Sequence, residues 1–403
     1  MTQLTVVGGV YREVMMWPPS DEVYGSAGRA ACSIAMMGAS VALYGYADTD
    51  ADQAMAGFAD FYGFKWHPTP IDQGVVFRYA HGLARPEISK WSSNAAPISV
   101  SSPSVLRYGM LEGAPQVSAD RVVYDPQNTD RPEWFRANGS TANHLAIVLN
   151  EHEATTLLGK HLTPEELLTE VAKAESAEVV VLKQGARGAM VFDQGRVEHV
   201  SAFETIGVSK VGSGDQFSAQ FAMAWLIDGL NAAESALRAS KATAYFCENG
   251  RFPNRAELAA YSPAPLTFGP MRESGKRAVV YLAGPFFKLS ELWIVEEARN
   301  QLFAMGLDVR SPFHDIGRGP AGVVVPADIA AIAESDFVYA IADGLDSGTI
   351  YEIGYARALG KPVVVYAENE SAEDLKMMEG SDCFISRDFV SSIYRAGWIG
   401  ASM

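Results

Sequence analysis

Short runs of hydrophobic residues alternate along the chain with longer stretches in which hydrophobic positions recur every three or four residues. The short runs predict buried strands, and the periodic stretches predict amphipathic helices. In the front part of the chain the predicted strands are Leu4–Gly9, Val41–Gly45, Val75–Tyr79, Arg121–Asp125, Asn143–Leu149 and Val179–Lys183. The predicted helices are Arg29–Gly38, one from Glu151, Thr163–Glu175, Ser213–Asp228 and Asn231–Cys247. This alternation predicts an α/β fold with a largely parallel, doubly wound sheet.

Two other features of the front part are expected to break the alternation. A loop is predicted over Tyr24–Gly28, ahead of the first helix. A hairpin is predicted from Ala189–Asp193 to Arg196–Val200, where Gln194-Gly195 forms the turn.

The pattern stops between Tyr261 and Lys276, where proline, glycine and charged residues occur without periodicity. Such composition is typical of a linker. The alternation then resumes with strands Ala278–Ala283, Leu307–Arg310, Phe337–Ile341 and Pro362–Tyr366 and helices Ser290–Met305, Pro326–Glu334 and Ile350–Leu359. We therefore predict a domain over residues 1–262, a linker over 263–276 and a smaller α/β domain over 277–403.

Composition narrows the classes of function. The 403 residues carry a net charge of −16 without a stripe rich in lysine and arginine, which argues against nucleic-acid binding. No apolar run is long enough to span a bilayer, and the first residues lack the pattern of a signal peptide. Cys32, Cys247 and Cys383 lie far apart, with no metal-binding spacing. We expect free thiols in a cytoplasmic protein that binds neither membrane nor nucleic acid.

A glycine-rich turn precedes one of the long predicted helices. Gly212, Ser213, Gly214 and Asp215 occupy it, and the two glycines let backbone N–H groups point at one anion. Asp215 could take a proton from an attacking hydroxyl while those N–H groups hold a transferring phosphoryl group. Glycine-rich helix starts are common, so this turn alone does not decide between a structural and a catalytic role.

Further motifs accompany this turn in a fixed order. They are Asp125-Pro126-Gln127-Asn128, Asn150-Glu151-His152-Glu153 and the stretch Lys183–Ala189, which contains Gly185. Together with the turn they resemble the ribokinase-like (PfkB-type) family of sugar and nucleoside kinases over residues 1–260, which implies an αβα sandwich and an ATP site with Mg²⁺. The resemblance makes Asp215 the catalytic base.

The same resemblance assigns roles to the other motifs. Gly212, Ser213 and Gly214 would form the anion hole, with Gly185 also at the ATP site. Asn150 and Glu153 would tune the binding of magnesium and phosphate indirectly, so no direct metal ligand is expected. Alternatively, Asn150 caps a helix and Glu153 is its reciprocal partner.

The chain departs from the family in three places, two of them at the sugar end. The stretch Gly25–Ala30 has no Asn where sugar hydroxyls usually bind, and Glu13 is the nearest carboxylate to a missing early aspartate. Ser209-Lys210 replaces the usual Asp-Thr. We therefore expect an acceptor other than ordinary ribose or fructose, or a front half that binds without transferring phosphate.

The second domain concentrates polar and small residues at predicted strand ends. Tyr281–Phe287 (YLAGPFF) ends its first strand, at the edge where ligands of open α/β sheets bind. Asp343–Ala356 (DGLDSGTIYEIGYA) follows a later strand and reaches the same edge. A helix is predicted from Ile350, with Glu352 on its first turn. Thr349 and Glu352 also fit a capping box, which is the structural alternative.

This ordered set resembles the nucleoside 2-deoxyribosyltransferase family and its nucleotide N-glycosidase relatives over residues 278–370, which implies a Rossmann-like (flavodoxin-like) parallel-sheet domain without a cofactor. The resemblance makes Glu352 the nucleophile that attacks the anomeric carbon, positioned by Tyr281. Asp346 and Asp328 would hold or protonate the departing base. Asp328 is also expected to open a helix, where it could simply be a cap, and Asp336 is the alternative to it.

Other side chains are candidates for binding the substrate. Gly284, Pro285 and Phe286 end the first strand, and Phe286 with Phe287 could stack on a base or belong to the core. His314 could contact a phosphate or the base, although a single loop histidine is more often structural. The turn Ser347-Gly348-Thr349 and the helix start behind it could bind a phosphate, which predicts a nucleoside 5′-monophosphate as substrate.

The sequence as a whole predicts an enzyme of two domains that acts on small nucleosides, nucleotides and sugars and self-associates. The back half would cleave or exchange N-glycosidic bonds, and the front half would phosphorylate a nucleoside or sugar. The alternative is a nucleotide sensor, in which an altered front half binds a ligand and regulates the back half. Base preference and the choice between water and a base as acceptor stay open.

Overall fold

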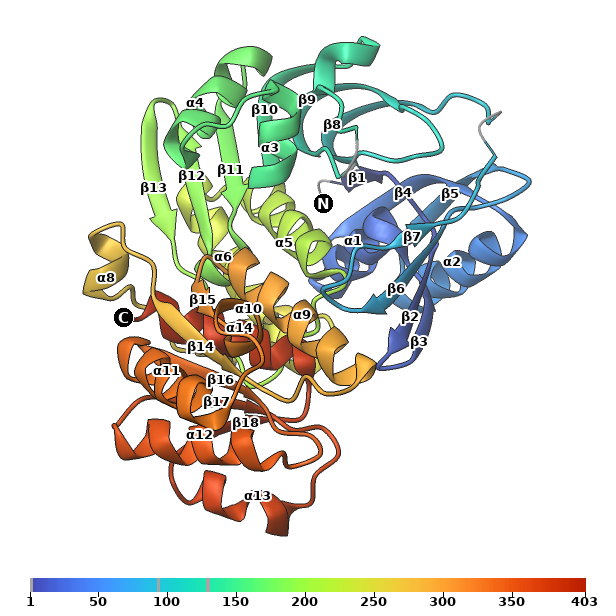
Figure 1. Ribbon diagram of the computed structural model, residues 1–403. Coiled ribbons are helices and arrows are strands. Elements are labelled where there is room, and N and C mark those ends of the chain that lie inside the picture. Colours follow the sequence, from blue (N-terminus) through green and yellow to red (C-terminus); the bar gives the residue numbers. More distant parts are fainter. Residues whose placement is uncertain (1–2, 93–94, 128–130) are drawn as a thin grey trace. The chain divides into compact units, whose positions relative to one another are not determined.

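The computed structural model describes residues 3–92, 95–127 and 131–403 (Figure 1). The chain divides into two compact units. Unit 1 contains residues 1–205 and 209–265, and unit 2 contains residues 206–208 and 266–403. No helix in the described part of the chain is long and apolar enough to cross a membrane.

In the described part of unit 1, nine strands form one sheet in the order β13-β12-β11-β10-β9-β8-β1-β4-β5. The strands are β1 (Gln3–Val7), β4 (Ser40–Ala47), β5 (Lys65–Pro70), β8 (Ser99–Tyr108), β9 (Gln116–Asp125), β10 (Thr141–Asn150), β11 (Val179–Lys183), β12 (Ala189–Asp193) and β13 (Arg196–Val200). Neighbours from β5 to β11 pair in parallel, which confirms the doubly wound prediction. β12 and β13 form the predicted antiparallel hairpin.

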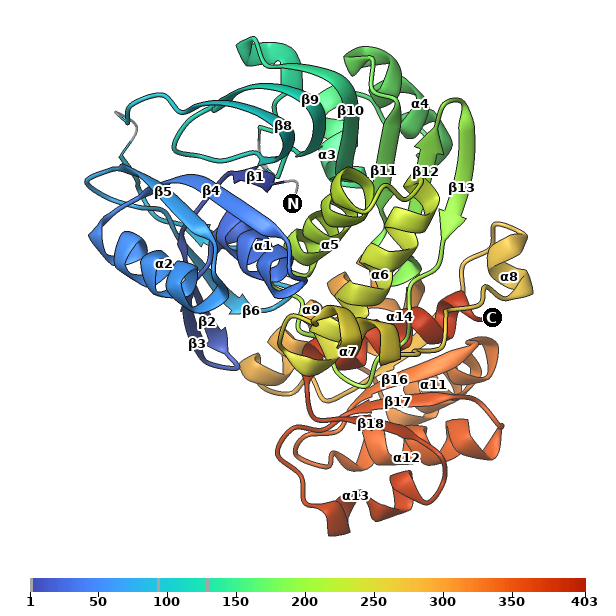
Figure 2. The same cartoon turned by 180° about the vertical axis from the view of Figure 1, so that it is seen from behind.

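Helices cover both faces of this sheet. They are α1 (Gly25–Met36), α2 (Thr49–Tyr62), α3 (Glu151–Leu158), α4 (Pro164–Glu175), α5 (Ser213–Ala222), α6 (Ala232–Asn249) and α7 (Arg255–Ala260). Along β10, Ala146 and Val148 pack in one hydrophobic core, while Ile147 and Leu149 pack in the other. Both faces of the strand are therefore buried, as in parallel sheets generally, and the unit is an αβα sandwich. Figure 2 shows α6 and α7 on the side away from α3 and α4.

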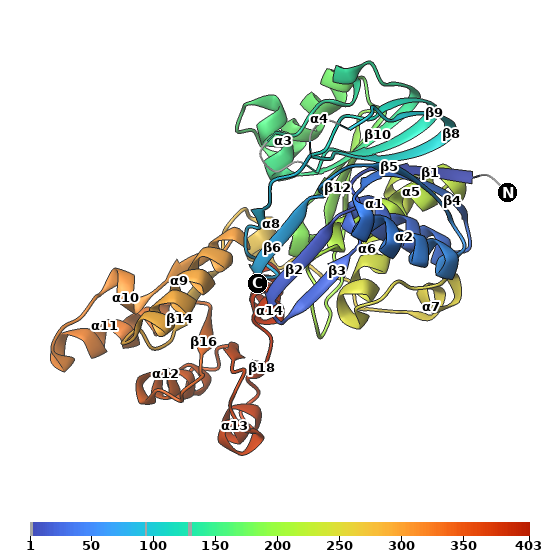
Figure 3. The same cartoon turned by 90° about the vertical axis from the view of Figure 1, so that its right-hand side faces the viewer.

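A second sheet in unit 1 has the order β3-β2-β6-β7 (Figure 3). Its strands are β2 (Arg12–Trp17), β3 (Ser20–Val23), β6 (Val76–His81) and β7 (Glu87–Ile88). Only β6 overlaps a predicted strand. The others mix charged with apolar residues and are largely exposed, so they lack the continuous hydrophobic run that marks a buried strand.

The predicted loop over Tyr24–Gly28 is wrong, because α1 already begins at Gly25. Gly25 has a φ of +62°, and a Cβ there would lie 2.5 Å from the carbonyl oxygen of Gly9. Only glycine fits that conformation and that approach. The small residues Ser26, Ala27 and Gly28 are buried inside the first turns of the helix rather than in a loop.

In unit 2, the described residues form a five-stranded parallel sheet in the order β15-β14-β16-β17-β18. The strands are β14 (Val279–Ala283), β15 (Asp308–Arg310), β16 (Phe337–Ile341), β17 (Val363–Tyr366) and β18 (Phe384–Ser386). The helices are α8 (Pro270–Glu273), α9 (Leu289–Ala304), α10 (Pro312–Asp315), α11 (Ala321–Glu334), α12 (Ser347–Ala358), α13 (Ala372–Glu379) and α14 (Phe389–Ala401). This is the predicted Rossmann-like arrangement.

The strand order of unit 2 reverses beside β14, because β15 pairs with one edge of β14 and β16 with the other. The carboxyl ends of β14 and β16 therefore flank a topological switch point, where open α/β sheets bind ligands. Two predicted helix starts are wrong. α12 begins at Ser347 instead of Ile350, and α11 begins at Ala321 instead of Pro326.

Candidate functional site

The side chains of Tyr281 and Glu352 meet in unit 2. Tyr281 lies in β14 and is fully buried, and its hydroxyl donates a hydrogen bond of 2.7 Å to Oε1 of Glu352. Glu352 lies on the second turn of α12, the helix that follows β16, so the predicted place on the first turn is wrong. The structure thus brings together two residues that the sequence predicts to act together, 71 positions apart.

The environment of Glu352 favours its neutral form. Burial raises the pKa of the Glu352 carboxyl group to about 7, and the nearby Asp328 and Asp346 carboxylates act in the same direction. The hydrogen bond from Tyr281 opposes this shift, because it stabilises the ionised form. Glu352 therefore titrates near neutral pH, which is the behaviour of many functional carboxyl groups.

Asp328 lies in the interior of α11, so the expectations that it opens or caps a helix are both wrong. Its Oδ1 atom is buried and has no hydrogen-bond partner among the described residues. Burial raises the pKa of the Asp328 carboxyl group. A buried carboxyl oxygen without a partner is costly, which marks Asp328 as a candidate functional residue.

The alternative residue, Asp336, has a structural contact instead. Its Oδ2 accepts a hydrogen bond of 2.7 Å from the backbone N–H of Val279, at the start of β14. That end of the strand is opposite the carboxyl edge. The structure therefore places Asp328, and not Asp336, near Glu352.

Asp346 caps α12. Its Oδ2 accepts hydrogen bonds from the Thr349 backbone N–H at 2.9 Å and from the Thr349 hydroxyl at 3.2 Å. The predicted capping box between Thr349 and Glu352 is therefore wrong, because Asp346 is the N-cap. Ser347 and Gly348 are exposed on the first turn, while Thr349 is buried.

The residues after β14 combine a tight backbone with exposed aromatic rings. A Cβ on Gly284 would lie 3.2 Å from the Cβ of Ile341, so the strand end tolerates little beyond glycine. Pro285 is buried behind it. The Phe286 ring packs 5.1 Å from the rings of both Phe287 and Phe313, and Phe287 is 66% exposed. The suggestion that the Phe286–Phe287 pair belongs to the core is therefore wrong.

His314 lies in the short helix α10, with both ring nitrogens engaged. Nε2 is 2.7 Å from Oε1 of Glu296, and Nδ1 is 2.9 Å from the Ser311 hydroxyl. These contacts support the structural role that was the alternative for this histidine.

In unit 1, the glycine-rich turn leads into α5. Gly212 has a φ of +82° and no side chain caps the helix. The Ser213 backbone N–H donates to the Lys210 carbonyl oxygen, and the Lys210 ammonium group donates to the Ser213 hydroxyl at 3.3 Å. A Cβ on Gly214 would lie 3.9 Å from Nζ of Lys183. The turn therefore combines a helix N-terminus with two lysines, an arrangement that suits an anion.

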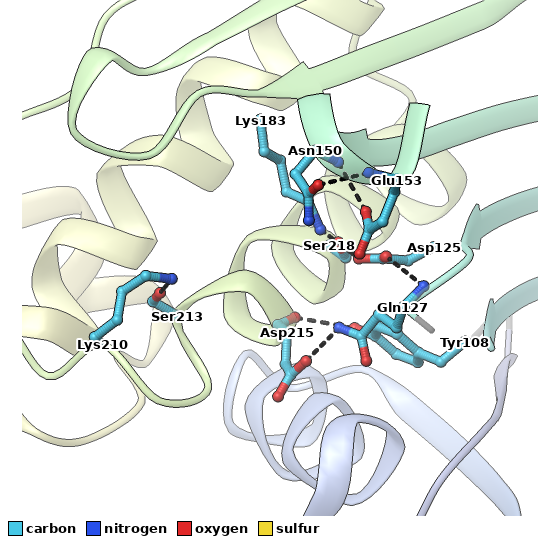
Figure 4. Close-up of polar contacts among 10 residues, drawn as sticks. All are labelled: Tyr108, Asp125, Gln127, Asn150, Glu153, Lys183, Lys210, Ser213, Asp215 and Ser218. Carbon is cyan, nitrogen blue, oxygen red and sulfur yellow. Dashed lines mark hydrogen bonds and ion pairs between the residues drawn. The ribbon is translucent and has the colours of Figure 1, made fainter. Parts of the chain in front are cut away.

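A buried polar cluster lies behind this turn (Figure 4). Nζ of Lys183 and the Ser218 hydroxyl both contact Oδ2 of Asp125, at 2.7 and 2.5 Å. Asn150 and Glu153 form a reciprocal capping box at the start of α3, so the capping alternative is confirmed. Burial raises the pKa of the Glu153 carboxyl group to about 7; Lys183 opposes that shift and Asp125 adds to it.

Two remaining sequence predictions concern the same region. Gly185 begins a short 3₁₀ helix, Gly185–Arg187, with a φ of +59°. Asn128, which belongs to one of the motifs, lies outside the described residues.

The Asp215 side chain has partners that the sequence prediction missed. Nη1 of Arg29 lies 2.8 Å from Oδ2 of Asp215, and Nη2 of Arg29 lies 2.6 Å from Oε2 of Glu13. Nε2 of Gln127 donates to Oδ1 of Asp215 at 2.5 Å, and the Tyr108 hydroxyl donates to the Asp215 carbonyl oxygen at 2.9 Å. An arginine among the small, buried residues of Gly25–Ala30 is the signal that could have revealed this cluster.

No group of three or more His, Cys, Asp or Glu side chains within the described ranges is arranged to hold a metal ion. The turn at Gly212–Gly214 fits a phosphate group, and Asn150 and Glu153 are engaged with each other rather than open as ligands. These residues fit a magnesium ion that reaches the protein through phosphate and water, as Mg²⁺ commonly does.

Comparison with solved structures bears on the fold of the front part. A protein from Agrobacterium tumefaciens described as a candidate ribokinase matches with a TM-score of 0.51 at 16% identity, over 64% of this chain and 96% of that chain. The ribokinase from Thermotoga maritima gives 0.47 at 16% identity, over 65% and 99%. The nucleoside kinase from Methanocaldococcus jannaschii gives 0.48 at 13% identity, over 64% and 97%. At such identity the first match supports a ribokinase-like fold and no more.

Comparison with protein-family models identifies two families in the chain. Residues 113–250 match the pfkB family carbohydrate kinase model. Residues 280–381 match the nucleoside 2-deoxyribosyltransferase model and include Tyr281, Asp328, Asp346 and Glu352. The chain therefore combines a region of the pfkB carbohydrate kinase family with a region of the nucleoside 2-deoxyribosyltransferase family in one polypeptide.

Proposed function

We propose that unit 2 cleaves or exchanges the N-glycosidic bond of a nucleoside or nucleoside 5′-monophosphate, with Glu352 as the nucleophile. The observation that carries this proposal is the hydrogen bond from the buried Tyr281 hydroxyl to Glu352. This bond engages Oε1 and restrains the carboxyl group at the switch point of the sheet, and we propose that Oε2 is the atom that attacks the substrate.

The chemistry follows a double displacement. The ionised Glu352 attacks the anomeric carbon, the C–N bond breaks, and its electron pair stays on the departing base. We propose that Asp328, whose carboxyl pKa is raised by burial, donates a proton to that base. A base or a water molecule then attacks the glycosyl–Glu352 ester, its proton passes to Asp328, and the Glu352 carboxylate is restored. Asp346 orients the base while it also caps α12.

We propose that the first turn of α12 binds the 5′-phosphate of the substrate. The exposed Ser347 and Gly348 can offer a hydroxyl group and backbone N–H groups to a 5′-phosphate at this helix N-terminus. We propose that Phe286, which follows β14, stacks on the base. We expect a nucleoside 5′-monophosphate to react faster than the matching nucleoside, and equal rates would refute the phosphate contact.

Substitution of Glu352 tests the central assignment. Glu352→Gln keeps the size of the side chain and its contact with Tyr281 but cannot form the ester, so turnover should fall by about 10³-fold or more. The matched control is Glu334→Gln, an exposed residue of α11, which should leave turnover unchanged. Products of a nucleoside and nucleotide panel are identified by mass, which also separates hydrolysis from base exchange. Full activity in Glu352→Gln would refute the mechanism.

For unit 1, we propose that the turn at Gly212–Gly214 binds ATP together with Mg²⁺. Lys183, Lys210 and the start of α5 would hold the phosphates, and Asn150 and Glu153 would act on the ion through water. The ion would neutralise charge on the donor's phosphate groups. Titration calorimetry with Mg-ATP tests this binding, and Gly214→Val should weaken it by crowding the turn.

Two further properties of the whole chain are proposals. We propose a homo-oligomer, because α11 exposes Val323 by 65% and Val325 by 45% of their surface. Light scattering on the purified chain tests this. We also propose a cytoplasmic setting, because Cys32, Cys247 and Cys383 are all free thiols.

A further inference from the structure

The residue that the pfkB resemblance makes the catalytic base of unit 1 is part of a buried ion cluster. Asp215 from α5, Arg29 from α1 and Glu13 from β2 are 7%, 3% and 7% exposed. Arg29 is central, since one guanidinium nitrogen contacts Asp215 and another contacts Glu13. We refer to these three residues as the Arg29 cluster.

The packing around Arg29 holds it against the glycine-rich turn. A Cβ added to Gly212 would lie only 2.2 Å from Nε of Arg29, so the guanidinium lies directly on the backbone of that turn. The guanidinium carbon also lies 5.3 Å from the centre of the Tyr24 ring. Arg29 therefore fills the space next to Asp215 and is supported on several sides.

This arrangement uses both oxygens of the Asp215 carboxylate. Oδ2 accepts from Arg29, and Oδ1 accepts from the side-chain amide of Gln127. A general base must come within about 2.6–3.2 Å of the hydroxyl whose proton it takes. An acceptor hydroxyl could occupy the side of Oδ2 where the guanidinium lies only if Arg29 moved away. Such movement would leave two buried carboxylates without their cation, which is strongly unfavourable.

We infer that Arg29 blocks phosphoryl transfer in unit 1, so that this unit binds a phosphate-bearing ligand without passing its phosphoryl group to a sugar. The inference rests on the proposed binding of Mg-ATP at the glycine-rich turn. It also supports the alternative that the chain is a nucleotide sensor, because it names Arg29 as the residue that would prevent phosphoryl transfer. It also accounts for the departures at the sugar end, since Arg29 lies in the stretch that lacks the usual Asn.

The test removes the guanidinium and looks for a gain of activity. Arg29→Asn, and the double variant Arg29→Asn with Glu13→Gln, are incubated with Mg-ATP and a panel of neutral sugars and nucleosides. Arg29→Asn alone leaves both Asp215 and Glu13 buried without a cation, which could prevent folding. The double variant also neutralises Glu13, so only the Asp215 carboxylate stays unpaired. In both, Asp215 could take the hydroxyl proton while the oxygen attacks the terminal phosphorus and ADP leaves. Phosphorylated product is measured by mass, and folding by thermal melting.

Wild type should form no product above the background without protein. A folded Arg29 variant should exceed it by about 10²-fold, the scale of a general base, and adding Asp215→Asn should abolish the gain. Arg12→Asn is the matched control, since its ion pair with Asp21 on the same sheet is exposed, and it should gain nothing.

Two results would overturn the inference. The first is product formation by wild type that Asp215→Asn removes. The second is a lack of product from folded Arg29 variants, which would show that Arg29 is not the obstacle. Calorimetry with Mg-ATP on wild type separates these results from a failure of the proposed ATP site, and base release from nucleosides reports on unit 2 independently.

Discussion

At the scale of single residues, the Glu352 carboxyl group shows burial and a hydrogen bond acting in opposite directions. Burial raises its pKa to about 7, and Tyr281 restrains the rise. Because the folded pKa lies above the usual value, the contribution of Glu352 to stability is full at acidic pH and is lost as pH rises through about 7. The reactive, ionised form is thus gained as stability is lost.

Tyr281→Phe tests this balance. Loss of the hydroxyl removes a hydrogen bond that favours the ionised form, so the pKa of Glu352 should rise further. The acidic limb of kcat/KM should move to higher pH, with a fall of about tenfold at pH 6 and a smaller fall at pH 9. Tyr339→Phe is the control, because that hydroxyl contacts Ser392 instead. A uniform loss at all pH values would instead indicate a role in substrate binding.

For single residues, the sequence identified candidate catalytic side chains, but it rarely showed which other side chains they contact. It singled out Tyr281 and Glu352, which the structure joins. It did not assign a role to Arg29, because the residues next to an arginine in a helix do not identify the distant carboxylate with which it forms an ion pair. Asp215, its partner, is 186 positions away.

At the scale of elements, helix α12 carries the candidate nucleophile and is capped by another candidate catalytic residue. Asp346 caps this helix, and the helix carries Glu352. The start was predicted three residues too late because Ser347, Gly348 and Thr349 look like a turn in sequence, whereas Asp346 satisfies the first N–H groups and lets the helix begin earlier.

Substitutions of Asp346 separate these two roles. Asp346→Asn keeps a capping oxygen, so stability should change little while turnover falls, because the carboxylate is lost. Asp346→Ala removes both and should also destabilise the protein by about 1 kcal/mol. Ser371→Ala, which removes the cap of α13, should cost similar stability without affecting turnover. Denaturant unfolding and initial rates provide the two measurements, and full turnover in Asp346→Asn would exclude a catalytic role.

The elements found and missed differ in their hydrophobic pattern. Strands such as β11 and β16 are continuous apolar runs and were predicted within a residue. β8 was missed because its first half, Ser99–Pro103, reads as a polar turn, although the strand pairs along its length with β9. Pairing with neighbours formed that strand where its own residues gave only a weak signal.

At the scale of the whole molecule, each of the two units contains a hydrophobic core of its own. Leu149 is fully buried between β10 and the helices α3 and α4 of unit 1, and Leu375 of α13 is buried in the core of unit 2. Chains with separate cores commonly unfold in more than one step.

Leucine-to-alanine substitutions should therefore act on different transitions. Leu149→Ala should destabilise unit 1 by about 3 kcal/mol and Leu375→Ala unit 2 by a similar amount, because each leaves a cavity. Scanning calorimetry should show one transition lowered by each substitution, with Mg-ATP raising only the transition that Leu149→Ala lowers. A single transition lowered by both would show that the units unfold together.

The sequence by itself determined the alternation of the strongly hydrophobic strands with the long helices, the restart of the pattern after residue 276 and the types of side chain that follow those strands. These follow from local hydrophobic periodicity and from motifs of a few residues. The tertiary structure alone decided that Asp328 rather than Asp336 lies near Glu352, that Asp346 caps α12 and that Arg29 forms an ion pair with Asp215. Each of these depends on which distant residues share a buried space, and burial and charge pairing across the fold have no signature in the local pattern.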